Sequence, residues 1–327
     1  MGLFDKLYPL WIICSVGIGL ALGQLNGIDL YADALLLPLL ILMLYFTFLQ
    51  IPFSEMRRSF AHRRFTYTSL WLNFIFTPLL AWLLASLFLS EQPLLWLGFL
   101  LLMVTPCTDW YIIFTKLAKG NVALATSILP LNLVLQLLLL PVYLFLFSGT
   151  VGMIDFQLVL ESIVLALLVP FFLTFVTRHF VIKKGKEPWI EKANAWPTFF
   201  LCFAIIAMFA SQGRLLFEHF ALFLQLFVPI VAFFVIIFIL GRFIGKHLKF
   251  KQADTTSLNF TTMARNSPIA LAVALTAFPH EPLIAIVLVI GPLLELPILS
   301  FFSYSIVLLH QRSQVNGLEQ QKCRTRV

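Results

Sequence analysis

Long apolar segments separated by short polar loops run through the whole chain. A helix that crosses a membrane needs about 20 mostly apolar residues. Ten segments meet this requirement, at residues 7–25, 33–52, 65–89, 93–117, 121–147, 155–181, 195–212, 219–243, 255–278 and 282–309. The pattern predicts an all-α polytopic membrane protein with ten transmembrane helices and no inserted soluble domain. The polar residues 311–327 are predicted to form a disordered cytosolic tail.

Composition and charge agree with this class. Hydrophobic residues make up 61% of the chain and charged residues 11%, whereas a soluble protein carries about 25% charged residues. Lysines and arginines gather in alternate loops, among them Arg57, Arg58, Arg63, Arg64, Lys183, Lys184, Lys186, Lys246, Lys249 and Lys251. Basic loops stay in the cytosol, so both termini are predicted to be cytosolic. The predicted location of the protein is the plasma membrane, which in a bacterium is the inner membrane. This orientation signal accounts for the net charge of +7 without a nucleic-acid partner.

The fourth segment contains a break. Residues 102–114 read L-M-V-T-P-C-T-D-W-Y-I-I-F, with Pro106, Cys107 and Asp109 in the middle. Proline removes a backbone donor and clashes with the preceding helical turn. Backbone groups freed in this way cannot face lipid, so the break must be buried in protein or line a wet cavity. An aspartate at this depth is a functional candidate, because a charge there costs about 2.5–3.5 kcal/mol.

The ninth segment contains a matching break. Arg265, Asn266 and Pro268 again combine a charge, an amide and a helix breaker within an apolar span. Two broken spans in corresponding halves of ten favour two five-helix repeats, the second inverted, with discontinuous helices 4 and 9 crossing at the membrane midplane. This design is common among secondary transporters.

Each chemical candidate at the two breaks has two interpretations. Asp109 and Arg265 either form a buried ion pair that holds the crossing, or one of them titrates or contacts a substrate. Cys107 is either a small buried hydrophobe, as most unpaired cysteines are, or a soft thiol ligand for a thiophilic solute.

Further polar groups lie within apolar spans. Glu295, between Pro292 and Pro297, is a candidate proton carrier, and the alternative is a hydrogen bond between helices. Asn73 shares a helix face with Thr77, and Asn132 shares one with Gln136, because each pair is four residues apart. Such amides either join helices, at about 0.6–2 kcal/mol each, or line a site.

The sequence contains no constellation for catalysis. It has no Gly-Lys-Ser phosphate loop, no Gly-x-Ser-x-Gly nucleophile motif and no His/Cys cluster with metal-ligand spacing. An enzyme, a cofactor and a metal site are therefore not expected.

Four stretches together carry a family resemblance: P-C-T-D-W-Y, N-V-A-L-A-T-S-I-L-P-L-N-L-V-L-Q, A-R-N-S-P-I-A-L-A-V-A-L and V-I-G-P-L-L-E-L-P. They resemble the yeast-type arsenite-efflux carriers of the arsenical-resistance family, within the bile acid/sodium symporter superfamily. The resemblance implies a core of residues 65–147 and 219–309 beside a panel of residues 7–52 and 155–212. It also implies an essential cysteine at the position of Cys107 and a functional glutamate at Glu295.

One departure bears on the solute. Typical arsenite carriers have a glutamate shortly after the asparagine of the ninth helix, where this chain has Ser267 and Pro268. An arginine at this depth favours an anionic solute over neutral arsenous acid.

The resulting hypothesis is a secondary transporter that exports arsenite, with antimonite as a second solute, by alternating access coupled to protons rather than sodium. Its predicted substrate-binding residues are Cys107, Asn73, Asn132, Gln136, Arg265 and Asn266. The coupling proton is assigned to Asp109 or Glu295, and the helix breaks to Pro106 and Pro268. The alternatives are a cation-coupled organic-anion symporter of the bile acid type and a membrane receptor that does not transport. The expected partners are a small inorganic or organic solute, a coupling ion and the lipid bilayer.

Overall fold

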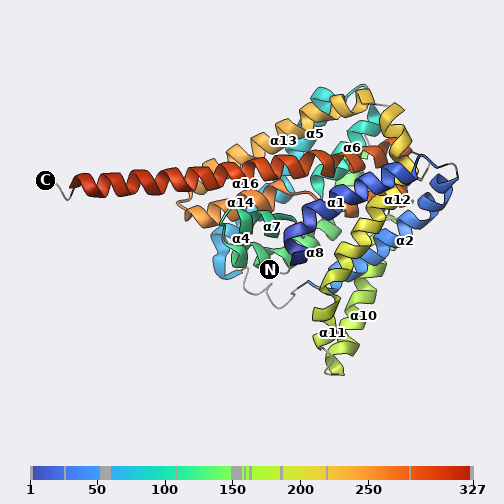
Figure 1. Ribbon diagram of the computed structural model, residues 1–327, viewed down its shortest axis with the longest axis horizontal. Helices are drawn as coiled ribbons and strands as arrows, with labels where there is room; N and C mark the ends of the chain where they lie inside the picture. Colours follow the sequence, from blue (N-terminus) through green and yellow to red (C-terminus); the bar gives the residue numbers. More distant parts are fainter. Residues whose placement is uncertain are drawn as a thin grey trace.

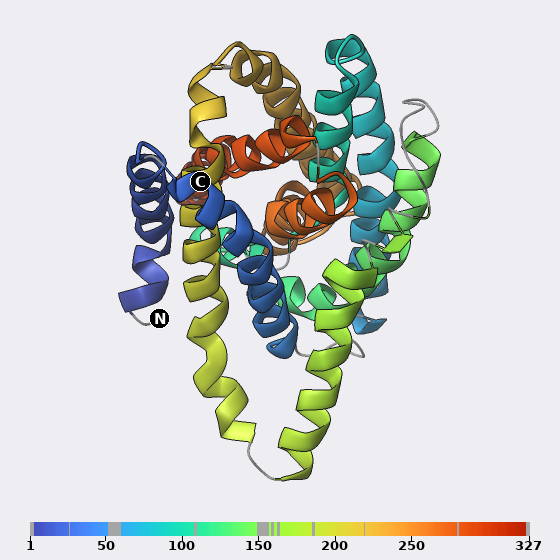
Figure 2. The same ribbon diagram turned by 90° about the vertical axis from the view of Figure 1, so that its right-hand side faces the viewer.

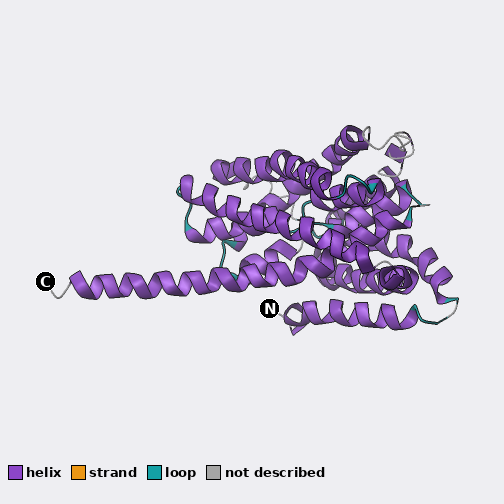
Figure 3. Ribbon diagram, turned by 90° about the horizontal axis from the view of Figure 1, so that it is seen from above, coloured by secondary structure: helices purple, strands orange, loops and turns teal. Residues whose placement is uncertain are grey.

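A computed structural model describes most of the chain. It covers residues 3–25, 27–51, 60–107, 110–148, 157, 160–161, 164–184, 187–218, 220–279 and 281–324. These residues are overwhelmingly helical, and Figure 3 shows only helices and loops among them. The predicted all-α fold is confirmed, and helix is present within each of the ten predicted segments.

The helices of the first half include several short pieces. They are α1 (Leu3–Leu22), α2 (Ile28–Leu49), the 3-10 turn η2 (Phe60–His62), α4 (Arg63–Trp71), the π-helical turn η3 (Leu72–Phe76), α5 (Thr77–Phe88), α6 (Pro93–Val104), α7 (Trp110–Leu117) and α8 (Val122–Ser148). Those of the second half are the π-helical turn η4 (Val164–Leu168), α10 (Val169–Lys183), α11 (Glu187–Lys192), the 3-10 turn η5 (Ala193–Ala195), α12 (Trp196–Glu218), α13 (Phe220–His247), α14 (Gln252–Met263), α15 (Ser267–Ala277) and α16 (Pro282–Arg324).

Length and apolar composition identify the membrane spans. Six helical stretches among the described residues are long and apolar enough to cross a membrane, and shorter apolar helices include α6 and α15. Helices α6 and α15 are short because their spans are interrupted: α6 and α7 together make the fourth span, and α14 and α15 together make the ninth.

The prediction of a disordered tail is wrong for residues 311–324. These residues continue α16, which extends far beyond the rest of the molecule (Figure 1). The reason is local: residues 311–324 contain no proline, and nine of these fourteen residues are Gln, Glu, Leu, Lys or Arg, which are good helix formers.

Helices α1, α2, α10 and α12 pack against one another and form what we call the first helix group. Helices α10 and α12 extend beyond the neighbouring helices in Figure 2 and are joined through α11 at their far end. Two glycines allow close approach of α1 to α12: a Cβ added at Gly19 would lie 2.7 Å from the Ile206 carbonyl oxygen, and one at Gly23 would lie 2.8 Å from that of Ala210. Small residues at such positions are typical of helix packing in membranes.

The remaining long helices form the second helix group. Here α16 packs on α6 and α15, α13 packs on α14, and α14 packs on α7 and α8. The two groups meet where α15 contacts α2 and where α12 contacts α16. The broken spans lie in the second group, with α15 and α16 facing the first.

Candidate substrate site at the helix crossing

The two helix breaks meet each other. Helix α6 ends at Val104 and α14 ends at Met263, and the extended residues that follow pair as an antiparallel bridge between Pro106 and Arg265. The Cys107 backbone N–H donates to the Ala264 carbonyl at 3.0 Å, and the Asn266 N–H donates to the Thr105 carbonyl at 2.7 Å. Backbone groups that the prolines exclude from helices therefore pair with each other, which meets the requirement for buried non-helical backbone in a membrane.

Side chains at the breaks cap the helix ends. The Thr105 hydroxyl lies 3.0 Å from the carbonyl oxygens of both Leu101 and Leu102, in the last turn of α6. On the other strand of the bridge, Asn266 is the N-cap of α15, and its side-chain oxygen accepts from the Ile269 N–H at 3.2 Å. Pro268 lies in the first turn of α15, where its missing N–H leaves no bond unmade.

Arg265 is buried at the crossing, with 1% of its surface exposed. Its guanidinium donates to the carbonyl oxygens of Met263 at 3.0 Å, Met103 at 2.9 Å, and Thr262. These carbonyls belong to the last turns of α6 and α14. The charge therefore lies where the C-terminal ends of the two half-helices converge, each of which carries a partial negative charge of about half a unit.

Two further predicted residues contact Arg265. The Asn73 side chain accepts from the guanidinium at 3.2 Å and donates to the Thr261 carbonyl at 3.1 Å, so it joins η3 to α14. Glu295 of α16 accepts from the Arg265 backbone N–H at 2.8 Å and is 4% exposed. The crossing therefore places Arg265, Asn73 and Glu295 together, although they are far apart in the sequence.

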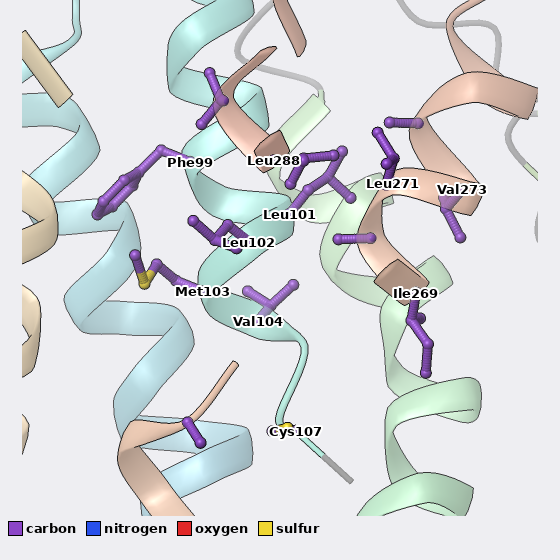
Figure 4. Close-up of a cluster of buried hydrophobic side chains, with 14 of the residues drawn as sticks. Phe99, Leu101, Leu102, Met103, Val104, Cys107, Ile269, Leu271, Val273 and Leu288 are labelled. Atoms are coloured by element: carbon purple, nitrogen blue, oxygen red, sulfur yellow. The ribbon is translucent and has the colours of Figure 1, made fainter. Parts of the chain in front are cut away.

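Cys107 lies in the extended segment that follows α6. Figure 4 shows it beyond the end of α6, on the chain that continues past Val104. The thiol is buried, and its sulfur accepts from the Trp110 N–H at 3.3 Å, at the first residue of α7. The predicted coupling residue Asp109 lies outside the described residues.

Asn132 and Gln136 lie one turn apart on α8, and both are buried. Neither side-chain amide has a hydrogen-bond partner among the described residues. Burying an amide without a partner costs about 1–3 kcal/mol, so this pair is conspicuous among the polar groups of the spans.

A cavity of about 320 Å³ lies beside the crossing, between the two helix groups. One wall belongs to the first group and includes Val16, Leu40, Met208 and Phe209. The other wall includes Trp110, Arg265, Ser267, Pro268, Glu295 and Ser300. The lining is largely apolar, and its polar groups come from the second group.

Sequence reasoning missed most of this cavity wall. Val16, Leu40, Met208 and Phe209 are ordinary apolar residues of apolar helices, and no local signal distinguishes them from residues that face lipid. Trp110, by contrast, adjoins the first predicted break, and that position could have indicated it, whereas Ser267 lies within the second predicted break. The described residues contain no group of three or more His, Cys, Asp or Glu that could hold a metal ion.

Crossed discontinuous helices beside an internal cavity define a class, the multi-pass membrane transporter. Residues 37–219, more than half of the chain, match the Sodium Bile acid symporter family. The chain belongs to this family. Membership implies a small solute and a coupling ion, and it makes the protein a transporter rather than an enzyme.

Curated relatives cover nearly the whole chain. The arsenical-resistance protein Acr3 of Corynebacterium glutamicum is 26% identical, over 93% of this chain and 89% of its own. The Acr3 protein of Alkaliphilus metalliredigens is 22% identical over 91% of each. The uncharacterized protein YbaS of Bacillus subtilis is 27% identical, over 91% of this chain and 96% of its own.

Proposed function

We propose that this protein is a secondary transporter that exports arsenite, and also antimonite, from the cytosol in exchange for protons. The names of the two Acr3 relatives support the solute. We place the protein in a bacterial inner membrane with both termini in the cytosol, because the basic loops alternate.

The observation that carries the proposal is the cavity between the two helix groups. One wall comes from α1, α2 and α12, and the other from α7, α15, α16 and the crossing. If residues 7–52 and 155–212 act as a panel and residues 65–147 and 219–309 as a core, rocking of one against the other would open this cavity to each side in turn. Rigid-body movement around a fixed midplane site is the usual form of alternating access.

When the Glu295 carboxyl carries its proton, the charge balance at the crossing suits a neutral solute. Two half-helix ends with about half a negative charge each oppose the single charge of Arg265, whose guanidinium donates to their carbonyls. The arginine therefore does not require an anionic substrate. Arsenous acid is uncharged, and a thiol is the soft ligand that trivalent arsenic prefers. Cys107 is buried and is not among the residues that line the cavity, but its sulfur accepts a hydrogen bond from Trp110, which does line it, so we propose that its thiol meets the solute when the site opens.

Three other groups receive roles. Glu295 borders the cavity and carries the coupling proton. Asn132 and Gln136 are not among the residues that line the cavity. We assign their buried amides, which lack partners among the described residues, to the path that the solute takes when the two helix groups move. Asn73 and Asn266 act indirectly, because each holds backbone of the crossing in place.

The experiment is arsenite uptake into everted membrane vesicles that carry the Cys107→Ala variant. We expect arsenite transport to be abolished while the amount of protein in the membrane is unchanged. Cys202→Ala is the matched control, because that cysteine belongs to α12 of the first helix group and not to either broken span. Wild-type uptake by the Cys107 variant would reject the thiol role. Loss in both variants would show that the effect is not specific to the crossing.

A second candidate is a cation-coupled organic-anion symporter. The size and largely apolar lining of the cavity favour it, because about 320 Å³ falls within the range of about 300–1,000 Å³ typical of sites for larger organic ligands. A deletion strain with unchanged sensitivity to arsenite and antimonite, together with sodium-driven uptake of an amphipathic carboxylate in proteoliposomes, would favour this candidate over arsenite export.

A further inference from the structure

The carbonyl groups at the ends of the two half-helices have an unusual partner. The last four carbonyls of any helix lack partners within that helix. In α14, the Phe260 carbonyl accepts from the Ala264 N–H, the Thr261 carbonyl from Asn73, and those of Thr262 and Met263 from Arg265. All four are therefore satisfied, and two of them by one guanidinium.

The same guanidinium also reaches the other half-helix. The Arg265 guanidinium donates to the Met103 carbonyl at 2.9 Å. The carbonyls of the two residues before Met103 accept from the Thr105 hydroxyl. One positive charge therefore bridges two helix C-termini that belong to spans about 160 residues apart in the chain. The bridge is possible only because the spans cross at their breaks.

Two converging C-termini form a site for a cation. Together they present about one unit of negative charge, in a region where unsatisfied carbonyls cost several kcal/mol each. In transporters with discontinuous helices, such carbonyls coordinate the coupling Na⁺ or H⁺. In this protein the Arg265 guanidinium occupies the position between the two helix ends.

Surrounding groups hold the guanidinium in place. The Asn73 side chain accepts from the guanidinium at 3.2 Å. The Cζ atom of Arg265 lies 5.3 Å from the centroid of the Phe233 ring of α13. An aromatic face at that distance attracts a cation. The backbone of Arg265 is itself part of the bridge to Pro106. Neither the guanidinium nor the backbone that carries it can therefore move without disrupting the crossing.

We propose that Arg265 is the permanent cation of the crossing, tethered where a bound metal cation would otherwise lie, so that this carrier neither binds nor needs Na⁺ or K⁺ at the half-helix ends. The inference rests on the proposed function only in treating the protein as a carrier. It does not depend on the identity of the solute. It makes Arg265 a positioning residue rather than a substrate ligand.

Removal of the arginine should create a binding site for a small monovalent cation. The test measures the melting temperature of the purified full-length protein in detergent. The salts compared are choline chloride, sodium chloride, potassium chloride, and millimolar guanidinium chloride, which is too dilute to denature. Wild-type protein should melt at the same temperature in all four. Arg265→Ala should melt lower in choline, and saturating Na⁺ or guanidinium should raise its melting temperature by roughly 5 °C at about a hundredfold excess over Kd.

Control variants separate this site from general effects of losing an arginine. Arg242→Ala removes a half-buried arginine of the adjacent helix α13 and should gain no cation response. Arg265→Lys keeps a charge at the crossing and should respond less than Arg265→Ala. If Arg265→Ala does not fold, Arg265→Gln takes its place, because it leaves the same carbonyls without a cation.

Two results would overturn the inference. One is saturable stabilisation of the wild-type protein by Na⁺ or K⁺. The other is a variant at position 265 that responds to small cations no more than Arg242→Ala does. Neither measurement uses arsenite. A cation response without arsenite transport would therefore reject only the solute, and arsenite transport without a cation response would reject only the role of Arg265.

Discussion

The Glu295→Gln variant tests whether Glu295 carries the coupling proton while keeping its hydrogen bond to the backbone of the crossing. In the wild-type protein, the Glu295 carboxyl accepts from the buried Arg265 backbone N–H at 2.8 Å. Glutamine keeps this acceptor oxygen and nearly the same volume, but it has no proton to exchange. We therefore expect a stability change below about 1 kcal/mol, the size of a typical net hydrogen bond. Glu295→Leu should instead cost about 1–3 kcal/mol, because the Arg265 N–H would lose its acceptor.

The size of the functional effect follows from the pH gradient. One pH unit is worth about 1.4 kcal/mol per proton, which drives roughly tenfold accumulation of a solute exchanged for one proton. In everted vesicles with an acidic interior, wild-type protein should therefore accumulate arsenite. The Glu295→Gln variant should only equilibrate it, while arsenite counterflow without a pH gradient continues.

Two measurements check this reasoning. Accumulation and counterflow are compared in the same vesicles, and thermal unfolding in detergent confirms that the variant is folded. Accumulation by Glu295→Gln that follows the pH gradient as in the wild type would refute the role of Glu295 as proton carrier. Loss of counterflow in a stable variant would also contradict it, since the residue would then be needed for binding or movement of the solute.

Two further predictions concern packing and the unpaired amides. Gly19→Ala should lower stability by about 1–3 kcal/mol, because its Cβ would lie 2.7 Å from the Ile206 carbonyl oxygen. Gly17→Ala has nothing within 4 Å and should be neutral or stabilising by up to about 1 kcal/mol, because alanine is the better helix former. Equal melting temperatures of the two variants would contradict the close approach of α1 and α12. Replacement of Asn132 or Gln136 by leucine should leave the melting temperature equal or higher, because each amide is buried without a partner among the described residues. The same replacement should abolish arsenite transport. Full transport would show that these amides do not line the solute path.

The helices and their interruptions were predictable because they depend on local properties. A span is recognised from about 20 apolar residues, and a break from a proline whose missing donor and ring disrupt the turn before it. Pro106 and Pro268 therefore indicated where α6 and α14 end, within a few residues. Residues 311–324 are helical although their polar composition predicts disorder, because most of them are good helix formers.

The partners of the buried charges could not be predicted in this way. The sequence shows that Arg265 lies in an apolar span, and such a residue suggests an ion pair or an anionic solute. Only the crossing brings the carbonyl of Met103 within 2.9 Å of its guanidinium and the carboxyl of Glu295 within 2.8 Å of its backbone N–H. Carbonyl oxygens are present at every residue, so no sequence pattern marks the ones that a distant arginine will bind.

The sequence by itself determined the membrane class, the segments that cross, and the two positions where spans are broken, since these follow from hydrophobicity and backbone chemistry over a few turns. Tertiary structure alone decided that α6 and α14 end at the same place, that Arg265 serves both ends, and that Val16 and Met208 line a cavity rather than face lipid. The physical reason is that the charge of a helix end and the shape of a cavity depend on which segments converge, and convergence is a property of the packed helices.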